Sequence, residues 1–115
     1  MPNFFTDNAD IRFLFDHIDL ATLARIQEDD FADARRSPSN GDPGPFDYAP
    51  ADAADAIDNY RRILEIAGQI AGDIIAPRAE QIDEEGNTLN EDGTVTLHAL
   101  VADNIRRLAQ ADLMG

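Results

Sequence analysis

The residues best suited to acid–base or nucleophilic chemistry are few and scattered. The chain has two histidines, His17 and His98, two serines, Ser37 and Ser39, and no cysteine. Nucleophilic catalysis needs a base beside the nucleophile and a third group that orients the base. Both serines lie in a Pro- and Gly-rich stretch without such support, and His17 adjoins an apolar helical face, where we expect it to cap or pack. We therefore assign no catalytic residue.

Two acidic runs raise the question of a carboxylate pair or a metal site. In Glu28-Asp29-Asp30, neighbouring side chains on a helix point apart and nothing apolar nearby would raise a pKa, which favours a solvated helix end. The run 83–92 has no register with EF-hand ligand spacing. A phosphate-binding loop, a dinucleotide fingerprint and a His-Glu-x-x-His zinc motif are also missing from the sequence. No metal-binding or cofactor-binding residue is assigned.

Three arginine doublets are the remaining candidates for binding an anionic ligand. They are Arg35-Arg36, Arg61-Arg62 and Arg106-Arg107. Acidic residues at helical spacing favour surface ion pairs for two of these doublets. The expected pairs are Asp58 with Arg62, Arg61 with Glu65, and Asp103 with Arg107.

Length and charge limit the class of protein that must position these residues. The chain has 115 residues, 9 basic against 23 acidic side chains and a formal charge of −14, as expected for one small acidic domain. This charge opposes nucleic-acid binding. The lack of cysteine excludes disulfides and thiolate zinc sites. Without a visible signal peptide or an 18-residue apolar window, we expect a cytoplasmic protein with no membrane span.

Apolar spacing predicts helical structure over residues 8–35, as one bent helix or two short ones. Ile11, Leu14, Phe15 and Ile18 recur on one helical face, and Asp19 is suited to cap a second helix. In that second stretch we expect Leu20, Leu23 and Ile26 to face inward. Three prolines and two glycines in residues 37–45 then predict a flexible loop over 37–46.

The strongest helical signal spans residues 51–75. Its inner face is expected to carry Ile57, Tyr60, Leu64, Ala67, Ala71, Ile74 and Ile75. Gly68 and Gly72 lie four residues apart, which favours close packing against a neighbouring helix and leaves an oligomerisation face as the alternative. Pro77 must kink the helix or restart it.

The remaining residues predict a short helix, a ribbon and a final helix. A helical turn or two over 78–84 should end at Gly86-Asn87. The turn Asn90–Gly93 lies between β-branched segments and favours a short two-stranded ribbon near residues 88–96. We expect Thr96 to cap a last helix that runs to about Asp112, with Gly115 as a C-terminal cap. Its inner face would carry Leu97, Leu100, Val101, Ile105 and Leu108. The predicted fold class is all-α, a small helical bundle with this one ribbon.

Several segments resemble the N-terminal helical domain of acyl-CoA dehydrogenases. The segments are Tyr48-Ala49-Pro50-Ala51-Asp52, the stretches 56–66 and 71–77, and Leu108-Ala109-Gln110-Ala111-Asp112-Leu113-Met114-Gly115. The opening, Asn3-Phe4-Phe5-Thr6-Asp7-Asn8 with Phe15-Asp16-His17-Ile18-Asp19-Leu20, is similar to the extension of a large bacterial subgroup that includes 3-methylmercaptopropionyl-CoA dehydrogenase-like enzymes. The resemblance covers nearly all of the chain except residues 36–46.

The resemblance implies a piece of a larger flavoprotein of fatty acid metabolism. Residues 1–36 would be an N-terminal extension and 47–115 the helical domain, with the chain ending at a domain junction. The full-length oxidoreductase would bind FAD, dehydrogenate an acyl-CoA thioester to the 2-enoyl-CoA, pass electrons to an electron-transfer flavoprotein and form a homo-oligomer. The family's glutamate base and flavin contacts lie outside this segment, so the 115-residue chain alone would bind no cofactor and have no activity.

A second hypothesis assigns the chain to another class of protein. It would be a self-contained acidic helical module that binds a partner protein or oligomerises through the small-residue face at Gly68 and Gly72. In contrast, a domain of a larger enzyme should expose apolar side chains where the other domains would pack.

Overall fold

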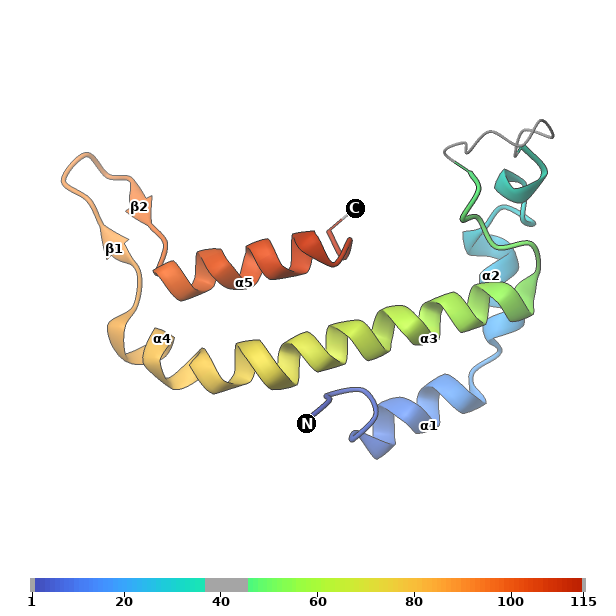
Figure 1. Ribbon diagram of the computed structural model, residues 1–115, viewed down its shortest axis with the longest axis horizontal. Helices are drawn as coiled ribbons and strands as arrows, with labels where there is room; N and C mark the ends of the chain where they lie inside the picture. The colour runs from blue at the N-terminus through green and yellow to red at the C-terminus, as the bar shows by residue number, and fades with distance from the viewer. Residues whose placement is uncertain (1, 37–45, 115) are drawn as a thin grey trace. The chain divides into compact units, whose positions relative to one another are not determined.

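The computed structural model describes residues 2–36 and 46–114, and this part of the chain is mostly helical (Figure 1). The α-helices are α1 (Ala9–His17), α2 (Leu20–Gln27), α3 (Ala53–Ile70), α4 (Ala79–Glu85) and α5 (Ala99–Gln110). Three shorter helical segments are η1 (Asp33–Arg36), η2 (Ala71–Ile75) and η3 (Ala76–Arg78), and two strands, β1 (Thr88–Leu89) and β2 (Val95–Thr96), form the ribbon. The predicted helical class with one short ribbon is confirmed. The loop predicted over 37–46 lies outside the described residues except for Phe46, and the Gly115 cap also lies outside them.

The chain divides into two compact units. We call Asp10–Ile63 the α2 unit, and Met1–Ala9 together with Leu64–Gly115 the α5 unit.

In the α2 unit, the predicted helical stretch 8–35 is two helices. Asp19 caps α2 as predicted, because its carboxylate accepts hydrogen bonds from the Thr22 amide at 3.2 Å and the Thr22 hydroxyl at 2.7 Å. On the apolar face of α1, Phe15 is buried, whereas Ile11, Leu14 and Ile18 are 40%, 55% and 47% exposed. Phe15 and Asp16 of α1 both contact Arg61 of α3.

Helix α2 ends in a left-handed turn that the sequence pattern did not predict. Asp29, Asp30 and Phe31 have φ angles of 48°, 53° and 60°. Aspartate tolerates this conformation better than most residues, whereas a bulky side chain such as that of Phe31 adopts it rarely. Backbone hydrogen bonds from Asp30 to the Arg25 carbonyl and from Phe31 to the Glu28 carbonyl hold the turn. The predicted helix end at Glu28-Asp29-Asp30 agrees with the end of α2 at Gln27, whereas the predicted helical stretch to residue 35 is interrupted by this turn.

Helix α3 confirms the strongest sequence signal, but the helical path changes at its end. Residues Ala71–Ile75 form a π-helical turn, in which the Ala76 amide donates to the Ala71 carbonyl five residues earlier, and a 3₁₀ turn, η3, follows. Pro77 has no N–H to donate to the Asp73 carbonyl, so the regular α-helical ladder cannot continue through this point. The predicted kink or restart is thus a π turn, a 3₁₀ turn and then α4.

In the α5 unit, the ribbon joins α4 to α5 (Figure 1). Helix α4 ends at Gly86, whose φ of 65° is readily accessible to glycine. The strands are antiparallel, with Thr88 opposite Thr96 and Leu89 opposite Val95. The predicted turn between them is closed by a hydrogen bond of 2.8 Å from the Asn90 amide to the Thr94 carbonyl.

Helix α5 starts and ends slightly inside its predicted limits. Its N-terminal cap is His98, not Thr96, and its last residue is Gln110, two residues before the left-handed Asp112. Thr96 is held in β2 instead, opposite Thr88. Because Thr96 is paired within the ribbon, the helix is capped by His98, two residues further along the chain.

Few side chains in the described residues are fully shielded from water. The buried apolar side chains are Phe5, Phe15, Ala24 and Ala56. On α5, Ile105 is 41% exposed and Leu97, just before the helix, is 48% exposed, so their predicted inward placement is wrong; the polar Asn104 is buried instead. The same correction applies to Leu23 and Ile26 on α2. Within the part of the chain that the structure describes, these side chains stay largely exposed to solvent.

Candidate functional site

The small-residue face of α3 and η2 is occupied by the chain's own N-terminal segment. A Cβ atom at Gly68 would lie 2.7 Å from the Phe5 amide nitrogen and still closer to the Asn3 side-chain oxygen, and one at Gly72 would lie 2.8 Å from the Pro2 carbonyl carbon. Such separations are shorter than van der Waals contact, so both positions require glycine for this approach. The predicted close packing is confirmed, although an irregular segment rather than a helix makes the contact.

Asn3 fixes this segment through all of its polar groups. Its side-chain NH₂ donates to the Glu65 carbonyl at 3.0 Å, and its side-chain oxygen accepts from the amides of Phe5 and Thr6. Its own amide donates to the Asp7 carboxylate at 2.9 Å. The Phe4 amide adds a hydrogen bond of 3.0 Å to the Gly68 carbonyl. The segment is thereby bonded to two successive turns of the helix.

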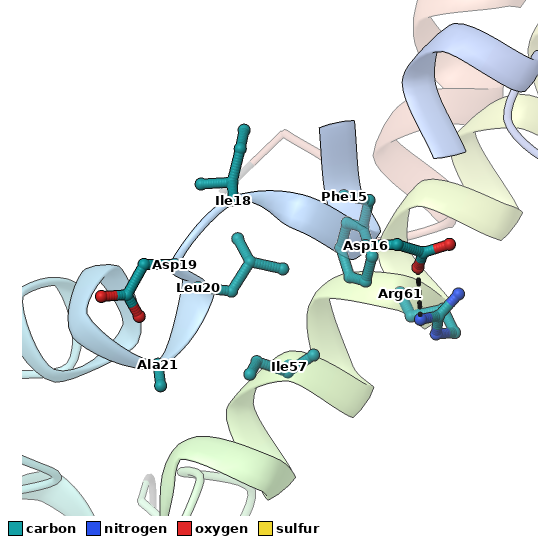
Figure 2. A pocket seen from close by; sticks show the side chains of 8 residues that line it. All are labelled: Phe15, Asp16, Ile18, Asp19, Leu20, Ala21, Ile57 and Arg61. Atoms are coloured by element: carbon teal, nitrogen blue, oxygen red, sulfur yellow. Dashed lines mark hydrogen bonds and ion pairs between the residues drawn. The ribbon is translucent and has the colours of Figure 1, made fainter. Parts of the chain in front are cut away.

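A pocket of about 320 Å³ lies in the α2 unit between α1, α2 and α3 (Figure 2). Its lining combines apolar side chains with three charged ones: Phe15, Asp16, Ile18, Asp19, Leu20, Ala21, Ile57 and Arg61. Leu20 and Ile57 reach toward the same space, whereas the Asp19 carboxylate points back toward α2 (Figure 2). A volume at the lower end of the range for ligand pockets suits a side chain or a small molecule.

Arg61 borders this pocket and makes contacts different from those the sequence predicts. Its guanidinium lies 4.7 Å from the centre of the Phe15 ring and 3.4 Å from the Asp16 carboxylate. The predicted ion pair with Glu65 is therefore wrong, because α1 brings an aromatic face and a carboxylate to the same guanidinium. In contrast, the predicted pair between Arg62 and Asp58 is present at 2.8 Å.

The pocket has binding features but no group prepared for proton transfer. The hydrogen bonds from the Thr22 hydroxyl and amide lower the pKa of Asp19, which keeps this carboxylate ionised and committed to the α2 cap. Asp16 is joined to Arg61. The arrangement is suited to an apolar group with a polar or charged end, not to acid–base catalysis.

A hydrogen bond links the end of α2 to α3 within the same unit. The Tyr60 hydroxyl donates to the Glu28 carboxylate at 2.7 Å. Burial and the Glu28 carboxylate together raise the pKa of Tyr60 to about 12. Glu28 therefore has a structural partner, whereas Asp29 and Asp30 of the same acidic run form the left-handed turn.

His98 joins three parts of the α5 unit. Its ring Nδ1 accepts from the Leu100 amide at 3.0 Å, its ring Nε2 bonds the Glu85 carboxylate, and its backbone amide donates to the Asn87 side chain at 2.9 Å. Because Nδ1 accepts a hydrogen bond, the neutral ring must carry its proton on Nε2, facing Glu85. The bond from His98 lowers the pKa of Glu85. His98 is thus a capping and positioning residue.

Asp103 is the centre of a cluster that contains three arginines. Arg78 approaches its carboxylate at 2.7 Å, Arg107 at 3.5 Å, and Arg106 bonds the other carboxylate oxygen. Arg78 also donates to the buried Asn104 side chain at 2.8 Å. The hydrogen bond from Arg78, together with Arg106, lowers the pKa of Asp103. The predicted Asp103–Arg107 pair is one part of this cluster.

Other candidates from the sequence have structural roles. The His17 ring stacks on Phe13 at 4.2 Å between centroids and bonds the Phe13 carbonyl, which agrees with the packing role expected for it. Arg35 donates to the Asp30 carbonyl at 2.7 Å, and Arg36 lies 3.4 Å from Asp33. Ser37 and Ser39 lie outside the described residues.

Residues 2–36 and 46–114 contain neither a cluster suited to a metal ion nor a helix suited to a membrane. In these ranges no group of three or more His, Asp or Glu side chains has an arrangement that would hold a metal ion. Within the same ranges, no helix combines the length and apolar character needed to cross a membrane.

Sequence reasoning missed the contributions of Arg78 and Asn104 to the Asp103 cluster. Arg78 follows Pro77 and reaches Asp103 across 25 residues of sequence. A weak signal was available, because Asn104 lies four residues after Leu100 and three after Val101, on the same face as those half-buried residues. A polar residue at such a position predicts a buried hydrogen-bonding partner.

Comparison with known proteins identifies no relative. The chain matches no protein-family model, no curated protein and no solved structure.

Proposed function

We propose that this chain is the N-terminal helical domain of an FAD-dependent acyl-CoA dehydrogenase. The full-length enzyme would convert an acyl-CoA thioester to the 2-enoyl-CoA, transfer electrons to an electron-transfer flavoprotein, and act in the cytoplasm as a homo-oligomer. The domain would have a packing role and would be inactive by itself. The proposal begins from the sequence resemblance.

The structural observation that supports the proposal is the number of large apolar side chains exposed to solvent in the described residues. Helix α2 shows this most clearly: it buries Ala24 completely while Leu23 and Ile26 are 50% and 74% exposed. Exposed large apolar side chains also occur on or near α1 and α5, including Phe13, Leu14, Leu97 and Ile105. Apolar faces of this kind are typical of surfaces that pack against another protein body.

The exposed apolar surface also fits the second hypothesis, a self-contained interaction module. However, the interface proposed for that module, at Gly68 and Gly72, is covered by the chain's own N-terminal segment. Pro2, Asn3 and Phe5 already occupy the space beside Gly68 and Gly72. A second copy would have to displace hydrogen bonds from Asn3 and Phe4 before it approached these glycines. A module would therefore need a different face, and the exposed residues of α2 are the better candidates.

The first experiment tests the enzyme assignment. The protein is expressed with whatever coding sequence follows residue 115, purified and assayed for bound flavin and for acyl-CoA-dependent reduction of a dye. We expect a yellow protein that reduces the dye, and no activity from the 115-residue chain. A product without flavin, or acyl-CoA oxidation by the 115 residues alone, would overturn the proposal.

A second experiment tests whether the α2 surface is a packing surface. Leu23→Ser and Ile26→Ser together should leave the helical circular dichroism of the 115-residue chain unchanged, because both side chains are exposed. In the full-length protein, the same changes should lower the unfolding temperature and increase flavin loss. Gln27→Ser is the matched control on the same helix. Equal behaviour of the control and the double variant would contradict a packing role for α2.

A further inference from the structure

Charge is distributed unevenly in the α5 unit. The sequence ranges of this unit, 1–9 and 64–115, contain 11 aspartates and glutamates but three arginines, Arg78, Arg106 and Arg107. All three arginines contact the same carboxylate, Asp103. The remaining acidic residues of the unit therefore have no arginine partner in these ion pairs, and the unit's permanent positive charge is concentrated at one place.

This concentration leaves a local surplus of positive charge. Three guanidinium groups surround one carboxylate, so the cluster carries two positive charges beyond those that Asp103 balances. Arginine remains protonated at every physiological pH, and the surplus is therefore permanent. Asn104 contributes a neutral oxygen to Arg78 and removes none of it.

Arg106 and Arg107 each use only one guanidinium nitrogen to contact Asp103. Arg106 contacts Asp103 through one terminal nitrogen and Arg107 through Nε, and their side chains are 65% and 49% exposed. Arg78 is more enclosed, at 23% exposed, and its bonds to Asp103 and Asn104 hold the base of the cluster. An anion arriving from solvent would meet two adjacent guanidiniums already oriented by a shared carboxylate.

We propose that Arg106 and Arg107, held by Asp103 and Arg78, bind the phosphate group of a small soluble ligand. A phosphate dianion matches the surplus of two positive charges, and its oxygens fit the paired N–H groups of guanidinium. A large anionic surface would also meet the acidic side chains of a chain with a formal charge of −14, which favours a small ligand over a phospholipid membrane. The inference does not depend on the acyl-CoA dehydrogenase proposal.

The test follows the Arg106 and Arg107 Nε–H resonances by NMR in the 115-residue chain during titration with inorganic phosphate. Acetate at matched ionic strength is titrated in parallel to separate binding from screening. We expect saturable chemical-shift changes with phosphate. In the double variant Arg106→Gln/Arg107→Gln, which lacks these Nε–H groups, binding is followed through the α5 backbone amides. We expect its dissociation constant for phosphate to be at least tenfold larger. The matched control is Arg35→Gln/Arg36→Gln, an exposed doublet in the α2 unit, which should bind as the wild type does.

One further variant and two further ligands make each outcome decisive. Arg107→Lys keeps the charge but removes the planar fork, and should weaken phosphate binding about threefold even if the double variant fails to fold. Adenosine monophosphate should bind at least as well as inorganic phosphate, whereas vesicles containing phosphatidic acid should show no gain over phosphatidylcholine vesicles. Equal shifts with acetate, equal weakening in the control doublet, or preferential binding to phosphatidic acid vesicles would each overturn the proposal.

Discussion

The side-chain oxygen of Asn3 lies in the space that a Cβ atom at position 68 would need, so the N-terminal segment and Gly68 are sterically matched. The match extends along the helix, because the Asn3 side-chain NH₂ bonds the Glu65 carbonyl and Phe5 is 3% exposed. The packing of Phe5 therefore depends on the absence of a side chain at Gly68.

Gly68→Ala should displace the N-terminal segment and destabilise the chain by about 2 kcal/mol, through partial exposure of Phe5. Urea denaturation measures this change. In a variant that lacks Pro2–Phe5, the same substitution should instead stabilise the chain by up to about 1 kcal/mol, because alanine favours helix over glycine. The same sign in both backgrounds would show that the segment does not pack on this face.

Tyr60→Phe should cost about 1 kcal/mol, because it removes the hydrogen bond to Glu28. Ultraviolet titration of the wild type should show one phenol with a pKa of about 12, and this transition should vanish in the variant. Tyr48→Phe, at a side chain that is 93% exposed, is the control and should retain that transition.

The raised pKa of Tyr60 also sets the sign of a stability change in alkali. Because its pKa in the folded chain is above its ordinary value of 10, the stabilisation is complete below pH 10 and is lost as the pH rises through about 12. Tyr60→Phe should remove this contribution to alkaline unfolding. An unchanged alkaline profile would contradict the assigned contact.

His98→Ala should destabilise α5 by about 1 kcal/mol through loss of its N-terminal cap, whereas His98→Asn should retain most of the stability. Amide hydrogen exchange at Leu100 reports the cap directly, and should accelerate in the alanine variant. Similar exchange rates in both variants would exclude a capping role for the histidine ring.

The His98 variants should also change the acid response of Glu85. The histidine lowers the pKa of Glu85 in the folded chain, so the stability from this contact is present above the ordinary value near 4.5 and is lost as the pH falls through the folded-state value. In His98→Ala, the NMR-detected pKa of Glu85 should rise toward the ordinary value. Gln81→Ala should produce a smaller rise, because Gln81 is the lesser cause of the shift.

Arg78→Met should destabilise the α5 unit by about 1 to 3 kcal/mol, because it leaves the buried Asn104 oxygen without its donor. Arg107→Met, at a side chain 49% exposed, should change stability by less than about 1 kcal/mol. Thermal unfolding at low and high salt compares the two. Equal losses in both variants would contradict the central position of Arg78.

Local sequence signals predicted the helices better than they predicted their partners. Asp19 and Gly86 were identified as ends of helices because capping and left-handed geometry depend on a few neighbouring residues. Arg61 was assigned to Glu65 on its own helix, but its observed partner, Asp16, is 45 residues away. Helical spacing contains no information about such a distant carboxylate.

The same limit applies to the candidate sites. Periodicity placed Leu23 and Ile26 inward because it identifies an apolar face without showing whether another element covers it. The Asp103–Arg107 pair was predictable from the spacing of four residues. Arg78 contacts Asp103 only because the ribbon between α4 and α5 reverses the chain and places α5 beside Arg78. The charge surplus there is a property of the folded chain.

The π turn at Ala71–Ile75 sets the angular phase of everything that follows it in the helical path. One additional residue in a helical turn rotates the subsequent side chains by about 100° around the axis. The direction in which α4 leaves the helix, measured from the Gly68 face that holds the N-terminal segment, therefore depends on the residue count within η2. A single-residue deletion there would restore ordinary helical phase and turn α4 relative to the Gly68 face that holds the N-terminal segment, although the contact between Glu85 and His98, which both follow η2, would remain unchanged.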